Sequence, residues 1–220
     1  MEMINKIGML FQNCPFDYAI CGGYAIDMFV GRKTREHGDI DLMLFWDQKQ
    51  VAAGFLHAKG YEIYEMLGGG KVRHMVHELS DERRNVFGMK PGCPLVELFE
   101  TGEENVYWMR FHHDGQNDPD YVEFLFNDMS DGLFIYPRAE GISREMNKAI
   151  LERNGVRYLA PEICLLYKSS ELDREGYRND FEAAFPLLDA EQKSWLAEAL
   201  RAAFPEGHEW IERLEKNNAD

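Results

Sequence analysis

The sequence predicts an α+β (α/β) protein in which a mixed β-sheet with flanking helices is followed by a C-terminal α-helical bundle. Three observations predict this fold. The short apolar run Tyr18 to Cys21 leads through two glycines into a helix-like segment that ends before Gly31. Residues 60–126 contain β-like runs separated by glycine turns. Beyond Pro161, apolar residues recur with the helical period of 3.6 residues.

In the N-terminal part, the pattern predicts alternating helices and strands. Apolar residues at helical spacing predict an opening helix over 3–11. The segment from Asp39 to Phe45 alternates charged and apolar residues and then becomes wholly apolar, which is typical of a strand with an exposed start and a buried end. A helix over 48–59 is expected next, with Asp47 as its N-cap.

The C-terminal part is expected to be helical. Helices are predicted over 162–170, 174–188, 190–203 and 206–214, with prolines between them. These patterns divide the chain into an α/β domain over 1–140 and a helical domain over 155–220.

Composition limits the classes of partner. The chain has 220 residues, with 24 Lys+Arg against 39 Asp+Glu, so its formal net charge is -15. Such a charge disfavours nucleic acid as a partner, because nucleic-acid binders neutralise phosphates with basic residues. No apolar run is long enough for a membrane helix, and a cytoplasmic location is expected. The four cysteines are widely spaced and are predicted to be reduced thiols rather than zinc ligands or disulfides.

Two features 16 residues apart carry the chemistry. Gly22 and Gly23 lie between a predicted strand and a helix, where backbone N–H groups can approach phosphate oxygens. Asp39 and Asp41 are two apart on a predicted strand, so both carboxylates project from one face, roughly 6–7 Å apart along the chain. Two such carboxylates favour a bound cation, and Mg²⁺ prefers oxygen ligands. The combination predicts phosphoryl-transfer chemistry.

These residues resemble a known superfamily. Gly22-Gly23 followed by Asp39-Ile40-Asp41 resembles the nucleotidyltransferase signature, and the fuller stretch from Gly22 to Asp41 is similar to the aminoglycoside-2''-adenylyltransferase-like family, a relative of the lincosamide nucleotidyltransferases. The segments 159–169 and 180–184 resemble the helical C-terminal part of that family.

The resemblance implies a nucleotidyltransferase-type sheet and assigns roles to several residues. Asp39 and Asp41 would be Mg²⁺ ligands, together with a third carboxylate that helps to deprotonate the acceptor. Glu123 is the candidate for that third position, because it is an ionisable residue within an apolar strand. Asp128 is the alternative. Arg35 and Lys168 are the basic candidates for the nucleotide phosphates, beside the backbone of Gly22-Gly23.

The sequence therefore predicts a Mg²⁺-dependent enzyme that transfers a nucleoside monophosphate, AMP from ATP, to a hydroxyl of a small molecule. An aminoglycoside- or lincosamide-like antibiotic is the expected acceptor, with a preference for a cationic one if the acidic surface lines the site. Two alternatives stay open: a toxin-type enzyme that adenylylates proteins, and a catalytically weak nucleotide-binding module. Either a monomer or a homodimer is compatible with the sequence.

Overall fold

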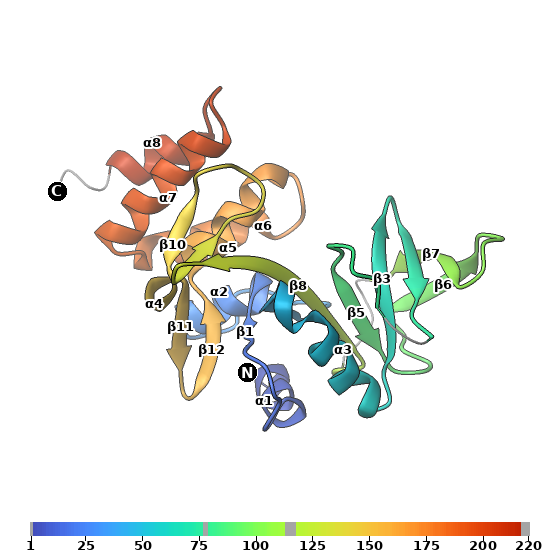
Figure 1. Cartoon of the computed structure of the whole chain (residues 1–220). Coiled ribbons are helices and arrows are strands. Elements are labelled where there is room, and N and C mark those ends of the chain that lie inside the picture. Colours follow the sequence, from blue (N-terminus) through green and yellow to red (C-terminus); the bar gives the residue numbers. More distant parts are fainter. Residues whose placement is uncertain (1, 77–78, 113–117, 217–220) are drawn as a thin grey trace. The chain divides into compact units, whose positions relative to one another are not determined.

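The structure is a computed structural model that describes residues 2–76, 79–112 and 118–216 (Figure 1). By its internal contacts the chain divides into two compact units. Unit 1 comprises Met1–Ile20 and Glu36–Phe126, and unit 2 comprises Cys21–Arg35 and Asn127–Asp220. Each unit is therefore built from two separate segments of the sequence. The expected division into domains 1–140 and 155–220 stays a prediction.

Unit 1 is built on an extended β-sheet. Its strands are β1 (Ala19–Ile20), β2 (Asp41–Phe45), β3 (Glu62–Gly68), β4 (Lys71–His74), β5 (Val86–Met89), β6 (Val96–Glu100), β7 (Val106–Phe111) and the first part of β8 (Tyr121–Ser130). Their order is β1-β2-β8-β5-β3-β4-β7-β6. The helices α1 (Glu2–Leu10) and α3 (Lys49–Ala58) complete the unit. This confirms the sheet-rich middle, and Gly68 to Gly70 form the turn of the β3–β4 hairpin.

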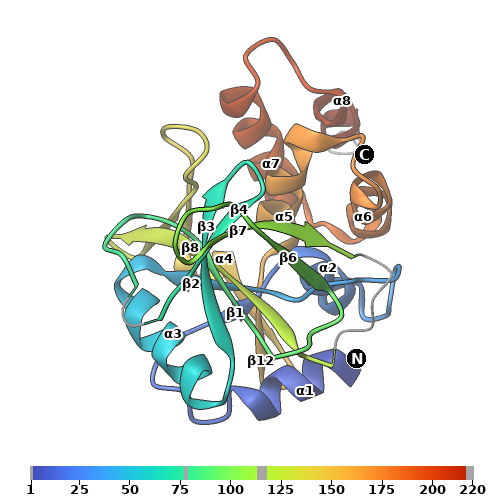
Figure 2. The same ribbon diagram turned by 90° about the vertical axis from the view of Figure 1, so that its right-hand side faces the viewer.

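Helices α1 and α3 cover one face of this sheet (Figure 2). The ring of Phe11, just after α1, stacks on Phe55 of α3 at 5.6 Å and meets Phe124 of β8 at 6.0 Å. Because successive side chains of a strand point to opposite faces, Tyr121 and Glu123 lie on the other face. That face carries a second apolar cluster, in which the rings of Tyr64 and Phe87 stack at 5.1 Å.

A buried ion pair fixes the loop after β4. Lys49 of α3 donates to Glu65 of β3 at 2.7 Å and to the backbone carbonyls of Ser80 and Glu82. The backbone N–H and hydroxyl of Ser80 donate to the same Glu65 carboxylate. Burying an ion pair is costly unless further hydrogen bonds satisfy both groups, and here they do. The pair therefore anchors residues 80–82 to the sheet.

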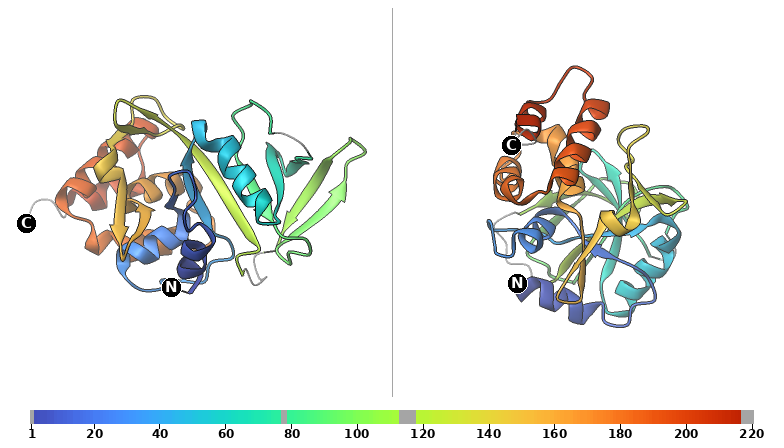
Figure 3. Two further views of the ribbon diagram at one scale, coloured as in Figure 1. Left: turned by 60° about the horizontal axis from the view of Figure 1, so that its bottom comes forward. Right: turned by 90° about the vertical axis from the view of Figure 1, so that its left-hand side faces the viewer.

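Unit 2 combines helices with two small hairpins. Its helices are α2 (Gly22–Val30), α4 (Met146–Ala149), α5 (Pro161–Lys168), α6 (Tyr177–Ala184), α7 (Ala190–Ala203) and α8 (Glu209–Lys216). Strands β9 (Leu133–Ile135) and β10 (Ser143–Glu145) pair with each other, as do β11 (Ile150–Arg153) and β12 (Val156–Leu159). The helices α5 to α8, orange to red in Figure 3, pack together, and the expected C-terminal helices are confirmed.

Side chains from the hairpins hold the helices of unit 2. Arg153 of β11 donates to the carbonyl of Met28 at 2.7 Å, so it caps the C-terminal end of α2. Arg144 of β10 pairs with the fully buried Glu162 at 2.8 Å, in the first turn of α5. These contacts fix α2 and α5, which both carry predicted site residues.

Two local expectations were wrong. Asp47 does not cap α3; it lies in a 3-10 turn over Trp46–Gln48, and Gln48 is the residue before the helix. The helix expected over 174–188 is shorter, because α6 spans Tyr177–Ala184 and gives way to a 3-10 turn that contains Pro186. Proline removes a backbone donor, so the last turn cannot continue as an α-helix.

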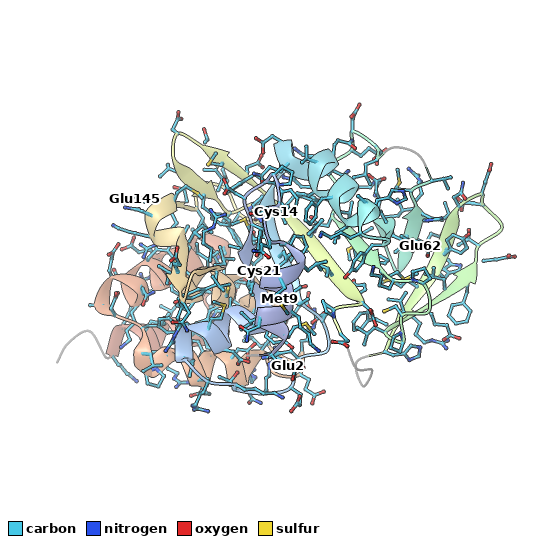
Figure 4. All side chains as sticks on the ribbon, turned by 90° about the horizontal axis from the view of Figure 1, so that it is seen from below. Glu2, Met9, Cys14, Cys21, Glu62 and Glu145 are labelled. Carbon is cyan, nitrogen blue, oxygen red and sulfur yellow. The ribbon has the colours of Figure 1, made fainter. Side chains whose placement is uncertain are left out.

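For the residues that the structure describes, two further features can be reported: the state of the cysteines and the presence of membrane helices. Among these residues, Cys14, Cys21, Cys93 and Cys164 form no disulfide, and the first two are labelled in Figure 4. Burial raises the pKa of the Cys164 thiol to about 12, so this thiol stays protonated at neutral pH. In the part of the chain that the structure describes, no helix is both long and apolar enough to cross a membrane.

Candidate functional site

The glycine pair begins helix α2. Gly22 has a φ of +67°, a conformation that glycine adopts without strain, and Cys21 before it is extended. The Cys21 side chain makes no capping hydrogen bond. The N–H groups of the first turn of this nine-residue helix provide the donors that an anion needs at a helix N-terminus. The glycines thus begin a helix after a strand, as predicted.

Three predicted carboxylates share one neighbour in unit 1. The hydroxyl of Tyr121 donates to Glu123 at 3.0 Å. Burial raises the pKa of Tyr121 well above its usual value, and the negative charges of Glu123, Asp41 and Asp39 raise it further. Strands β2 and β8 are neighbours in the sheet, and the N–H of Glu123 donates to the carbonyl of Ile40 between the two aspartates. The structure therefore brings Asp39, Asp41 and Glu123 into one electrostatic environment.

These carboxylates fit a magnesium ion by their chemistry. All three supply oxygen, the donor that Mg²⁺ prefers, and each side chain is partly exposed. Among residues 2–76, 79–112 and 118–216, no three His, Cys, Asp or Glu side chains group closely enough to hold a metal ion by themselves. Mg²⁺ is usually held by one or two carboxylates together with substrate phosphates, so a closed protein cage is not required.

The alternative third carboxylate lies further along β8. Asp128 is five residues beyond Glu123, so a regular strand directs the two side chains to opposite faces. It pairs in register with Ile135 of β9, in unit 2. Of Glu123 and Asp128, only Glu123 shares a strand face with Tyr121, which favours Glu123 as the third carboxylate.

The two predicted basic residues meet in unit 2. Arg35 donates from Nε and Nη2 to the two oxygens of Asp180 at 2.9 Å and 3.0 Å. Lys168 Nζ lies 2.9 Å from Asp180 Oδ2 and 4.3 Å from the centre of the Tyr177 ring. The Lys168 side chain is 6% exposed, whereas that of Arg35 is 24% exposed. Arg35 is therefore the more accessible of the two cations.

The burial of one residue in this region does not follow from local sequence patterns. Asp27 of α2 is 3% exposed and accepts hydrogen bonds from the backbone N–H and the hydroxyl of Thr34, at 2.8 Å and 2.6 Å. It therefore fixes the segment that leads to Arg35. Thr34 lies beyond Gly31, where α2 ends, so the helical period of α2 does not relate it to Asp27. Only the family-like pattern around the glycines could have indicated this contact.

The fold resembles that of a nucleotidyltransferase known from antibiotic resistance. The chain is similar to the solution structure of the antibiotic-resistance factor ANT(2'')-Ia, with a TM-score of 0.54 and 16% identity over 98% of this chain and 96% of that one. The expected α+β fold, with a large mixed sheet followed by C-terminal helices, is confirmed.

Part of the N-terminal sequence is similar to a known family. Residues 3–83 match the family model described as Aminoglycoside-2''-adenylyltransferase. This range contains Gly22, Gly23, Arg35, Asp39 and Asp41 and ends before Glu123 and Lys168. The resemblance to that family of antibiotic adenylyltransferases is thereby confirmed.

Two further solved structures are similar at lower TM-scores. A crystal structure of ANT(2'')-Ia in complex with adenylyl-2''-tobramycin aligns with a TM-score of 0.48 and 17% identity, over 90% of this chain and 94% of that one. The lincomycin-bound lincosamide adenylyltransferase LnuA aligns with a TM-score of 0.46 and 20% identity, over 81% and 94%. No curated protein sequence matches the chain.

Proposed function

We propose that the protein is a Mg²⁺-dependent nucleotidyltransferase that transfers AMP from ATP to a hydroxyl of a small molecule and releases pyrophosphate. One observation carries the proposal. The Glu123 backbone N–H donates to the carbonyl of Ile40, which lies between Asp39 and Asp41 in the sequence, and the Glu123 carboxylate accepts from Tyr121. Two of these carboxylates lie in the segment that matches an adenylyltransferase family.

Each group has a defined task in this reaction. Asp39 and Asp41, with Glu123, would hold Mg²⁺, which neutralises phosphate charge when bound. The backbone at Gly22-Gly23 and the cations Arg35 and Lys168 would bind the phosphates of ATP.

Glu123 would also act as the general base. It would accept the proton of the acceptor hydroxyl as that oxygen attacks the α-phosphorus. The new oxygen–phosphorus bond forms while the bond from the α-phosphorus to the bridging oxygen breaks. Pyrophosphate leaves with the electron pair of the broken bond, so the reaction needs no reactant beyond ATP and the acceptor.

The distribution of charge supports a cationic acceptor. Unit 1, which carries the three carboxylates, has 9 Lys+Arg against 19 Asp+Glu, whereas unit 2 has 15 against 20. A negative potential raises the local concentration of cations and speeds their association. Aminoglycosides, named in the family description, are polycations. A small polycation with several hydroxyl groups is therefore the acceptor class that we propose.

Pyrophosphate release tests the proposal. The purified chain is incubated with MgATP and an aminoglycoside, a lincosamide or an uncharged polyol. We expect release that depends on the acceptor and is fastest with the aminoglycoside. The KM for the aminoglycoside should rise several-fold between about 0.05 and 0.3 M salt, because salt screens charge attraction. No release with any small acceptor, but labelled protein bands in a lysate with labelled ATP, would favour protein adenylylation instead.

A further inference from the structure

Asp180 forms ion pairs with both cations that are proposed to bind the phosphates of ATP, Arg35 and Lys168. Its carboxylate is completely buried in α6, and its two oxygens accept from Arg35 and contact Lys168. Arg35 lies 145 residues earlier in the chain, and Lys168 is the last residue of α5. One side chain therefore ties together three separate segments of unit 2.

The backbone around Asp180 is shaped for the guanidinium of Arg35. Gly176, just before α6, has a φ of +86°, and a Cβ built there would lie 2.6 Å from Arg35 Nε. Any larger residue would displace the side chain of Arg35. The Asp180 N–H donates to the carbonyl of Gly176 at 2.9 Å, and the neighbouring Tyr177 ring lies beneath the Lys168 ammonium. The geometry at the start of α6 thus fixes both cations and their carboxylate.

Two other completely buried carboxylates, Glu65 and Glu162, have different partners. Glu65 holds Lys49 and the loop residue Ser80, and Glu162 holds Arg144 and Gln192. Those partners connect parts of the fold and have no assigned role in binding. Asp180 instead holds the two side chains proposed to contact nucleotide phosphates.

We propose that Asp180 is a positioning residue for the nucleotide, which holds Arg35 and Lys168 together so that phosphate oxygens meet a preassembled pair of cations. The inference rests on the proposed function, because the triphosphate of ATP is the ligand of the two cations. Arginine and lysine side chains lose much rotamer freedom on binding, and a buried carboxylate that orders them during folding removes this loss from the binding step.

Calorimetric titration of the full-length chain tests this role, with MgATP, tripolyphosphate and AMP as probes. Asp180→Asn keeps the shape of the side chain and removes its charge. We expect it to weaken MgATP and tripolyphosphate binding about tenfold, because charge-assisted hydrogen bonds hold both cations, and to affect AMP much less. In turnover, the KM for ATP should rise about tenfold while kcat changes less than about threefold.

Two further variants separate positioning from a general loss of stability. Glu162→Gln removes a carboxylate of the same burial from the ion pair with Arg144, in α5, and should leave the affinity for all three probes unchanged while the protein is folded by circular dichroism. Asp180→Glu keeps the charge but moves it by one methylene, and should restore part of the lost affinity. If Asp180→Asn does not fold, Asp180→Glu alone tests the role, and it should still weaken tripolyphosphate binding.

The outcomes distinguish the two proposals. A wild-type chain that binds MgATP and transfers AMP, beside a folded Asp180→Asn that binds tripolyphosphate equally well, would overturn the positioning role alone. The positioning role would also be overturned if Glu162→Gln weakened tripolyphosphate binding as much as Asp180→Asn does. A wild-type chain that binds neither MgATP nor tripolyphosphate would overturn the proposed function, and the role of Asp180 with it.

Discussion

The two units contain opposite kinds of candidate functional group: carboxylates in unit 1 and cations in unit 2. In unit 1 the Tyr121 hydroxyl donates to Glu123, and the charges of Asp41 and Asp39 raise its pKa further. In unit 2 the cations Arg35 and Lys168 both pair with the Asp180 carboxylate. Phosphoryl transfer depends on positioning and on charge neutralisation. Under the proposed function, unit 1 would provide the groups for metal and proton, and unit 2 the groups for phosphate.

A second difference concerns buried lysines. Lys49 in unit 1 and Lys168 in unit 2 are both about 5% exposed and both pair with a completely buried carboxylate. Lys49 also donates to two backbone carbonyls of one loop, so its role is to hold the fold. Lys168 shares its carboxylate with a partly exposed arginine. Burial of a charge alone therefore does not indicate a function. The role proposed for Lys168 depends on the partly exposed Arg35 that pairs with the same carboxylate.

The largest effect is expected from the two aspartates of unit 1. Asp39→Asn and Asp41→Asn should each lower kcat by about 10³-fold or more, because each removes charge that would hold the metal. Steady-state pyrophosphate release measures the loss, and circular dichroism checks the fold. Full activity in either variant would show that unit 1 does not supply the metal ligands.

The second-largest effect is expected from Glu123→Gln, with Asp128→Asn as its matched control. We expect Glu123→Gln to lower kcat about 10²- to 10⁴-fold, as the loss of a general base does. Asp128→Asn should change kcat less than threefold, because its side chain points to the other face of β8. The reverse order of the two effects would assign the third carboxylate to Asp128 and weaken the role of Tyr121.

Lys49→Met tests the contrast between the buried lysines. Leaving Glu65 buried without its partner should lower the free energy of unfolding by about 3–5 kcal/mol. At temperatures where the variant is folded, its affinity for MgATP should equal that of the wild type. Urea unfolding and calorimetric titration give the two values. A weaker affinity in the folded variant would mean that the Lys49–Glu65 pair is more than a structural anchor.

The smallest effect is expected from Tyr121→Phe. This change removes a hydrogen bond that favours the charged form of the Glu123 carboxylate. The acidic limb of the kcat profile should therefore move to higher pH, and kcat at neutral pH should fall a few-fold. The pH dependence of turnover between about pH 5 and 9 measures this, with Tyr64→Phe as a control on the same sheet face. An unshifted acidic limb would mean that Tyr121 does not act on the base.

Local patterns predicted most elements of the fold and the candidate residues, for physical reasons. The strand after Asp39 and the helix after Gly23 follow from hydrophobic periodicity and backbone chemistry. Glu123 became a candidate because a charge inside an apolar strand is costly unless it is paired. The hydrogen bond between Glu123 and Tyr121 could have been predicted from the sequence, since residues two apart share a strand face. The catalytic and binding roles of these residues remain predictions.

Contacts over long sequence separations could not be predicted in this way. The pairing of Arg35 with Asp180 joins residues 145 apart, and no local period relates them. The division into discontinuous units could not be predicted for the same reason, because the segment Cys21–Arg35 packs with residues that follow it by about a hundred positions or more. Local periodicity predicts where elements begin and end but carries no information about which of them pack together.

Mass spectrometry of the acceptor after incubation with MgATP shows whether the protein transfers AMP. Wild-type protein, Asp41→Asn and Glu162→Gln are each incubated with the same aminoglycoside. We expect wild type and Glu162→Gln to add one adenylyl group to the acceptor and release one pyrophosphate, whereas Asp41→Asn should leave the acceptor unchanged. An unmodified acceptor with the wild type, or equal product with Asp41→Asn, would contradict the proposed function.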